Sequence, residues 1–227
     1  MSNDIQYLFG KNSVGEIVKA DDAQKGELYY CPECGNEFVL RKSGNTGKGS
    51  RRPHFAHSTL TETCKYDNYL HTTFITLAVE KIREHISCNK PMDIEWKCTQ
   101  CGLNTHYKEN MLAGMIDVKT EYDMTICRPD IALISNKNRV SAVIEVIVTH
   151  KPEERTLNFY KENDIIVIQI IVKTDNDIEN IDYLLRHPTS VSLCKNPQCT
   201  YFVGYPPQQK QPQPKKRRII KRNSRIF

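Results

Sequence analysis

The sequence of 227 residues predicts an α/β fold in which helices pack on a central mixed sheet. Residues 68–86 place apolar side chains at i, i+4, i+7, i+8 and i+12, so one stripe of a long helix faces a core. The continuous Ile/Val run over 164–172 is typical of a strand buried on both faces. Between these two segments, three β-prone stretches at 109–122, 129–135 and 140–149 predict further strands.

The remaining elements complete an α-β-β-β-α-β order from residue 68 to 172. Asp67 or Asn68 can cap the start of the first helix. A second helix is predicted over 152–161, because Pro near the first turn followed by two glutamates suits a helix start. A short helix is expected over 177–186.

The chain divides into three parts by composition. We expect a zinc-binding module at 1–66, an α/β domain at 67–205 with a cysteine-containing insertion, and a basic tail at 206–227. Within the module, short strands are predicted over 3–19, at Tyr29-Tyr30 and over 38–40. The tail is rich in Pro and Gln before its basic run, which predicts a disordered or extended segment.

The overall composition indicates a globular protein with no membrane partner. Hydrophobic residues make up 39% of the chain and charged residues 26%. The longest apolar run, 165–172, is far too short to span a bilayer, and the N-terminus lacks a basic-then-apolar signal. We therefore expect an intracellular protein, cytoplasmic or nuclear, in which the nine cysteines are not held in disulfides.

Two Cys-x-x-Cys pairs suggest zinc instead. The first pair lies near two histidines and a further cysteine, which offers five candidates for four tetrahedral places. Either histidine can complete the site, and we favour the second, because the Phe-Ala between them would then pack inward. The candidates are Cys31, Cys34, His54, His57 and Cys64.

The second Cys-x-x-Cys pair, Cys98 and Cys101, lies in the polar insertion. Its candidate partners, Cys194 and Cys199, lie nearly 100 residues further along the chain. A shared zinc ion would therefore require the C-terminal part of the domain to return to the insertion. Closing so long a loop through a metal would stabilise the fold.

Asp130 and Glu145 form the candidate catalytic pair. Asp130 follows Pro129 at the mouth of an apolar strand, and Glu145 lies inside the apolar run of the next strand. Two carboxylates facing one another at a sheet end suit Mg²⁺ or Mn²⁺, which take oxygen ligands together with water and phosphate. A buried carboxylate is costly unless a cation or partner binds it.

The spacing resembles the PD-(D/E)xK nuclease superfamily, which has a restriction-endonuclease-like fold. The resemblance implies a metal-dependent nuclease in which Asp130 and Glu145 hold the metal and the metal activates water. It departs from the pattern at Ile147, where the superfamily has a Lys that can stabilise charge on phosphate. Candidate helpers in its place are His71, His150, Lys151 and Gln169.

The chain as a whole is more specifically similar to the competence protein CoiA-like family, over about residues 20–173. That family has a Cys-Pro-x-Cys module, a His-Phe-Ala-His motif, a nearby Cys and a nuclease-like domain. The resemblance implies a role in DNA processing or recombination. The matching residues are Cys31-Pro32-Glu33-Cys34, His54-Phe55-Ala56-His57, Cys64, His71, Asp130, Glu145 and the stretch 155–160.

The tail accounts for the basic character of the chain. The sequence has 32 Lys and Arg against 27 Asp and Glu, and eight of the basic residues lie in 206–227, so the remainder is slightly acidic. A run of this kind binds phosphates without sequence preference. Two other interpretations are a nuclear-import signal, which the run resembles, and a solvated, disordered chain end. The candidate DNA-binding residues are Lys215, Lys216, Arg217, Arg218, Lys221 and Arg222.

Two functions of different class follow. The first is a DNA nuclease with one or two structural zinc ions and a catalytic Mg²⁺ or Mn²⁺. The second is a catalytically inactive, zinc-containing nucleic-acid-binding protein of the same fold. The acid pair favours the nuclease, whereas Ile147 favours the inactive protein.

Overall fold

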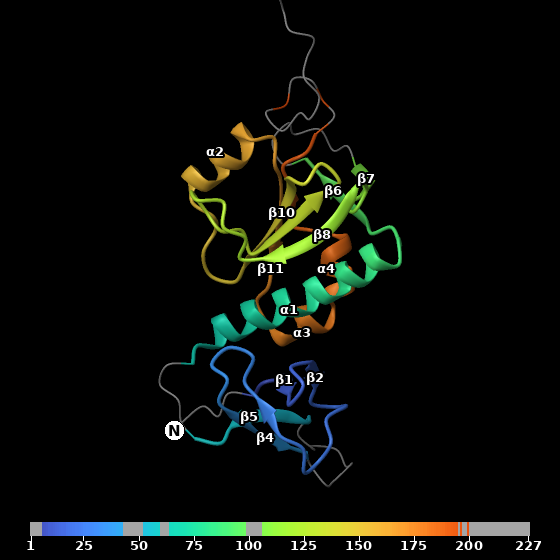
Figure 1. Cartoon of the computed structure of the whole chain (residues 1–227). Helices are drawn as coiled ribbons and strands as arrows, with labels where there is room; N and C mark the ends of the chain where they lie inside the picture. Colours follow the sequence, from blue (N-terminus) through green and yellow to red (C-terminus); the bar gives the residue numbers. More distant parts are fainter. Residues whose placement is uncertain are drawn as a thin grey trace, which may run out of the picture.

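The computed structural model describes residues 6–42, 52–59, 64–98, 106–194, 196 and 199. Figure 1 shows the successive layers along the long direction of the molecule: a small β-module formed by the N-terminal strands, the long helix α1, a larger sheet, and helix α2 on the other side of that sheet. The chain is thus a mixed α/β protein, as the sequence predicts.

The N-terminal module is an antiparallel sheet with strand order β2-β1-β3-β4-β5. The His-Phe-Ala-His segment, for which the sequence analysis predicted no strand, forms the edge strand β5. Phe55 within it is fully buried and bridges to Tyr7, which explains why this segment is extended. The strands are β1 (Phe9–Asn12), β2 (Ile17–Lys19), β3 (Tyr29–Tyr30), β4 (Glu37–Arg41) and β5 (His54–His57).

Helix α1 (Tyr66–Ser87) begins close to the predicted position and buries the predicted stripe, including Leu70, Phe74 and Ile82. The predicted cap is wrong. The N-cap residue is Lys65, without a side-chain cap, and Asn68 instead donates a hydrogen bond to Glu33 of the module at 3.0 Å.

The larger sheet has strand order β12-β11-β10-β9-β8. Only β10 and β11 are parallel, and helix α2 connects them. Alternate residues of β10 point to opposite faces, so Ala142 and Ile144 pack on the α1 side while Val143 packs on the α2 side. The elements are β8 (Met115–Thr120), β9 (Ile131–Ser135), β10 (Val140–Ile147), α2 (Glu154–Glu162), β11 (Ile166–Ile171) and β12 (Ser190–Val191).

The order α1, β8, β9, β10, α2, β11 follows the predicted series, with one addition. A separate hairpin, β6 (Asp93–Lys97) and β7 (His106–Asn110), lies between α1 and β8. The prediction of a single strand over 109–122 is therefore wrong. A turn closed by the Met115 N–H and the Leu112 carbonyl at 3.0 Å separates β7 from β8.

The predicted helix 177–186 is also two elements, α3 (Asp175–Glu179) and α4 (Ile181–Arg186). Asn180 ends one and begins the other. The first starts earlier than predicted, because Thr174 and Asp177 form a capping box.

One hydrophobic core crosses the predicted boundary at residues 66 and 67, with Tyr7 and Phe55 on one side and Phe74 and Ile170 on the other. Buried Asp175 of α3 also joins the two parts. Its carboxylate accepts hydrogen bonds from Tyr66 and Tyr69 of α1 and from the Leu8 backbone of the module. The module is therefore packed against the larger domain.

Candidate functional site

The first cysteine cluster forms where β3 turns into β4. The backbone carbonyl of Cys31 accepts a hydrogen bond from the Gly35 N–H at 3.0 Å, and Gly35 has a left-handed φ of 71°. This tight turn brings Cys34 back towards Cys31, and the chain before α1 adds Cys64, whose sulfur lies 3.6 Å from that of Cys31.

The histidine in this cluster is His57. Its Nε2 lies 3.3 Å from the sulfur of Cys34, and one potential ligand atom from each of Cys31, Cys34, His57 and Cys64 lies within 4.8 Å of all the others. His54 is buried elsewhere and its Nδ1 contacts the Arg52 carbonyl at 2.9 Å. Three sulfurs and one imidazole nitrogen are a donor set that suits tetrahedral zinc.

The electrostatics of this cluster favour a cation. Burial raises the pKa of the Cys31 and Cys64 thiols, and the charge of the neighbouring sulfurs raises that of Cys64 further. Burial also lowers the pKa of His57, which keeps its nitrogen free to act as a ligand. A bound divalent cation would offset the cost of ionising the thiols.

The second cluster brings together Cys98, Cys194 and Cys199, all buried. The sulfurs of Cys98 and Cys199 lie 3.4 Å apart. Trp96 of β6 donates a hydrogen bond to the Leu193 carbonyl at 2.9 Å, so the C-terminal segment does return to the insertion. Cys101, the predicted fourth member, lies outside the described residues.

The candidate catalytic acids lie side by side on the larger sheet. Ile131 of β9 pairs with Ile144 of β10, so Asp130 and Glu145 are the next opposite positions of the same antiparallel pair. Asp130 Oδ2 accepts a hydrogen bond from the Val146 N–H at 2.7 Å, which attaches this carboxylate to the strand that carries Glu145.

The two helices that flank the sheet each contribute one contact. His71 of α1 places Nε2 3.1 Å from Asp130 Oδ1. Tyr160 of α2, fully buried, donates a hydrogen bond to Glu145 Oε1 at 2.7 Å. The site therefore lies where α1, the sheet and α2 meet.

Burial raises the pKa of Glu145 to about 7, and the nearby charge of Asp130 adds to this effect, whereas the Tyr160 hydrogen bond opposes it. The contact with Asp130 raises the pKa of His71. A metal cation bound here would stabilise the ionised form of Glu145, because this carboxylate is buried and close to a second carboxylate.

The candidate helpers differ in position. His71 contacts Asp130, and Gln169 of β11 lies directly beside Glu145 in the parallel register. His150 and Lys151 are exposed beyond the end of β10, and His150 pairs with its neighbour Thr149. Ile147, in the position of the superfamily Lys, is buried at 5% exposure.

Glu121 was not among the site residues predicted from the sequence. It follows the last residue of β8, and its backbone N–H donates to the Asp130 carbonyl at 3.3 Å. Its charge contributes to the raised pKa of both His71 and Glu145. An acid just past the end of a strand is a usable signal for a site residue. The strand predicted over 109–122 ran past Glu121, so this residue was placed within the strand and not at its end.

The described residues contain two groups of three or more metal-ligand side chains within 4.8 Å of one another, and both are cysteine clusters. Asp130 and Glu145 are not part of such a group. The predicted DNA-binding residues of the tail, from Lys215 to Arg222, lie outside the described residues.

Comparison with known proteins bears on the N-terminal part. Residues 16–67 match the family model described as competence protein CoiA, N-terminal domain. The match covers the whole first cluster and supports the CoiA-like resemblance there, while the rest of that resemblance stays a prediction. No curated protein and no solved structure matches the chain.

Among the helices of the described segments, none has both the length and the apolar character that crossing a membrane would require.

Proposed function

We propose that this protein is a metal-dependent nuclease of the PD-(D/E)xK type that hydrolyses phosphodiester bonds in DNA. The observation that carries the proposal is the position of Asp130 and Glu145, which face one another on adjacent strands between two helices. The element order and the single parallel pair β10–β11 support a restriction-endonuclease-like core.

The two carboxylates are suited to hold Mg²⁺ or Mn²⁺, which would activate water and neutralise charge on the phosphate. Asp130 is held through both of its oxygens, Oδ2 by the Val146 N–H and Oδ1 by His71. Glu145, in contrast, is held through Oε1, by the Tyr160 hydroxyl. In the part of the chain that the structure describes, Glu145 Oε2 has no protein donor and remains for a cation. Tyr160 thus positions Glu145 without occupying both of its oxygens.

Gln169 is the best candidate for the role of the missing Lys. It lies beside Glu145 on the next strand, and the Ser190 hydroxyl donates to its Oε1 at 2.9 Å. Because that bond uses the carbonyl end of the amide, the NH₂ end is left to donate to water or a phosphate oxygen. His71 would orient Asp130 from the opposite side.

We propose structural zinc at both cysteine clusters. The first ion would be held by Cys31, Cys34, His57 and Cys64, and the second by Cys98, Cys194 and Cys199 with Cys101 as the predicted fourth ligand. Closed sites of this kind hold a fold together and leave no position for substrate. The acid pair, and not zinc, would therefore carry the chemistry.

A nuclease assay on single-stranded, duplex and branched DNA tests the proposal. We expect Mg²⁺-dependent cleavage that Asp130→Asn and Glu145→Gln each abolish, whereas Asp93→Asn, which changes an exposed acid of β6, leaves it unchanged. Cleavage by the unaltered chain should rise between pH 6 and 8, because Glu145, with a pKa of about 7, must ionise to bind the metal. Cleavage that persists in both site variants would place the reaction elsewhere.

The second candidate is a catalytically inactive nucleic-acid-binding protein of the same fold. Buried, apolar Ile147 in place of Lys favours it. An unaltered chain that binds DNA but does not cleave it with Mg²⁺ or Mn²⁺ at any pH in that range would establish this function instead.

A further inference from the structure

The loop between β8 and β9, residues 121–129, begins at Glu121 and ends next to Asp130 of the acid pair. Glu121 has a left-handed φ of 47°, which turns the chain out of β8, and its N–H donates to the Asp130 carbonyl. The loop is therefore clamped at its base, next to the carboxylates that we propose to hold the metal.

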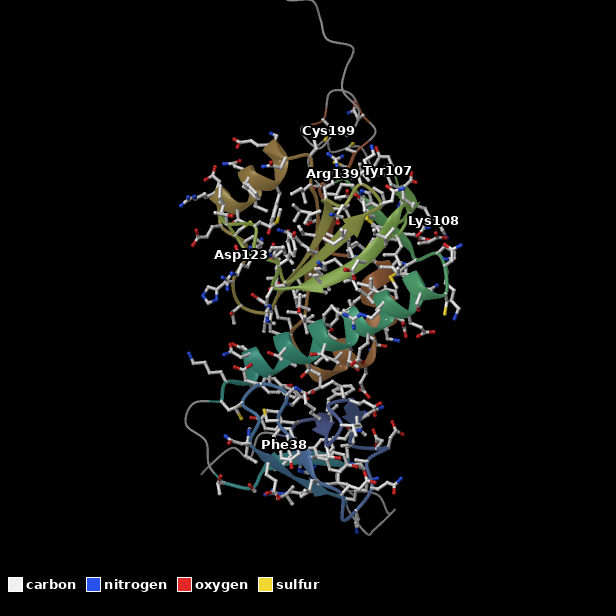
Figure 2. The ribbon with its side chains drawn as sticks, viewed as in Figure 1. Phe38, Tyr107, Lys108, Asp123, Arg139 and Cys199 are labelled. Carbon is white, nitrogen blue, oxygen red and sulfur yellow. The ribbon has the colours of Figure 1, made fainter. Side chains whose placement is uncertain are left out.

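The loop has a shape of its own. The Thr125 N–H donates to Asp123 Oδ1 at 2.7 Å, and Arg128 Nη2 lies 3.2 Å from Asp123 Oδ2. Met124 and Cys127 point inward and pack on the small core that contains Tyr160. Figure 2 shows labelled Asp123 beside the sheet, between α2 and α1. Met124 and Cys127 therefore attach the loop to the small core, whereas Tyr122 and Ile126 face solvent.

The outward side of the loop is apolar and aromatic, with cations at its margin. Tyr122 is 36% exposed and Ile126 is 49% exposed. Lys119 of β8 places Nζ 5.5 Å from the centre of the Tyr122 ring, and the Arg128 side chain is exposed at the other end of the loop. A cavity of about 330 Å³ borders this side, lined by Asp123, Thr125, Ile126, Cys127 and Arg128.

We propose that Lys119, Tyr122, Ile126 and Arg128, here called the loop surface, bind an unpaired strand of nucleic acid, with a base stacked on Tyr122. This rests on the proposed function and names its substrate class. An aromatic ring accepts the face of any base. Lys119 and Arg128, each exposed and paired with one aspartate, would contact the phosphates on either side of it. In a duplex the bases are already stacked on one another, so they have no free face to place on the exposed apolar surface beside the acids.

The position of the loop makes the proposal specific. Tyr122 directly follows Glu121, whose backbone N–H donates to the Asp130 carbonyl, so a base stacked on Tyr122 would lie close to Asp130. Stacking would therefore hold a phosphodiester near the acid pair.

Binding of fluorescent oligothymidylate and of a blunt hairpin duplex with the same number of nucleotides, measured by anisotropy, tests the proposal. The full zinc-containing chain with Asp130→Asn is used, without added Mg²⁺, so that no cleavage occurs. In this background we compare Tyr122→Ala, Tyr122→Phe and Tyr183→Ala. Tyr183 is a matched control because it is 61% exposed but lies on α4, away from the acids.

We expect Tyr122→Ala to weaken binding of the single strand by about tenfold, with a smaller effect on the duplex. Tyr122→Phe and Tyr183→Ala should stay within about twofold of the parent, because a ring keeps the stacking and α4 is remote. The loss should persist at raised salt, since salt weakens phosphate contacts far more than stacking.

Three results would overturn the proposal: unchanged single-strand binding in Tyr122→Ala, equal losses for single strand and duplex, or an equal loss in Tyr183→Ala. These results leave the nuclease proposal standing if the chain without the Asp130 substitution cleaves DNA. Conversely, if the unaltered chain does not cleave DNA but Tyr122→Ala shows the expected loss of binding, the proposal for the loop surface stands and the nuclease proposal is refuted.

Discussion

Glu145→Gln should make the protein more stable at neutral and alkaline pH, although it removes a proposed catalytic ligand. Glu145 is 9% exposed and burial raises its pKa from an ordinary 4.5 to about 7. In the folded chain the ionised form is therefore disfavoured, whereas the unfolded chain ionises at no such cost.

The size of the effect follows from that rise. At about 1.36 kcal/mol per pKa unit, the folded state loses about 3 kcal/mol relative to the unfolded state as pH rises from about 4.5 to about 7. Above pH 7 the loss is constant, and below pH 4.5 it is absent. Gln cannot ionise, and its carbonyl oxygen can still accept the hydrogen bond from Tyr160.

Urea unfolding of both proteins at intervals from pH 4.5 to pH 8, without chelator and with no Mg²⁺ added, measures this difference. Groups remote from the site titrate equally in both, so the difference in unfolding free energy between them reports Glu145 together with His71, whose pKa the Glu145 charge raises. It should grow by about 3 kcal/mol in favour of Glu145→Gln. Glu95→Gln, which changes an exposed acid of β6, should show no such growth.

Added Mg²⁺ provides a second check, because a ligand that binds only the folded state stabilises it. At pH 8 it should stabilise the unaltered chain and have little effect on Glu145→Gln. A difference that does not depend on pH, or a Gln variant that is less stable at pH 8, would refute the reasoning about the buried carboxylate.

Three further predictions concern the rest of the molecule. Protein purified without chelator should contain close to two zinc ions by metal analysis, and Cys64→Ser and Cys98→Ser should each lose one; no zinc in the unaltered chain would contradict both sites. Asp175→Ala should lower stability by about 3 kcal/mol, because the hydroxyls of buried Tyr69 and half-buried Tyr66 and one backbone amide lose the carboxylate as acceptor; a loss below about 1 kcal/mol would contradict this. Deleting 206–227 should reduce the slope of log affinity for DNA against log salt by roughly 3–4, if about half of its eight positive charges contact phosphates; an unchanged slope would leave nuclear import or solubility as the role of the tail.

The acid pair shows what local sequence could predict. Asp130 and Glu145 lie on consecutive strands joined by a short turn, in which Asn138 has a left-handed φ of 54°. A short turn allows few registers for the strands it joins, so their spacing alone indicated that the two carboxylates would face each other. Helix α1 and strand β11 were predictable for a similar reason, since their apolar periodicity is set residue by residue.

Other elements depended on turns that propensity did not reveal. The stretch 109–122 was β-prone throughout, yet Gly114, with a φ of 74°, belongs to a turn that divides it. In the same way, 177–186 was suited to one helix, but Asn180 ends α3 and starts α4. A single residue at a turn changed the outcome in each of these segments.

The sequence by itself determined the order of the main elements, the Cys-x-x-Cys turn and the paired acids, because each depends on residues close together in the chain. The sequence favoured His57 over His54 and offered Cys194 as a partner of Cys98, but only the tertiary structure brought these side chains into their clusters. It alone placed Glu121 against Asp130. These outcomes depend on how strands far apart in sequence pair and which side chains that pairing buries. Local patterns carry little information about such long-range contacts.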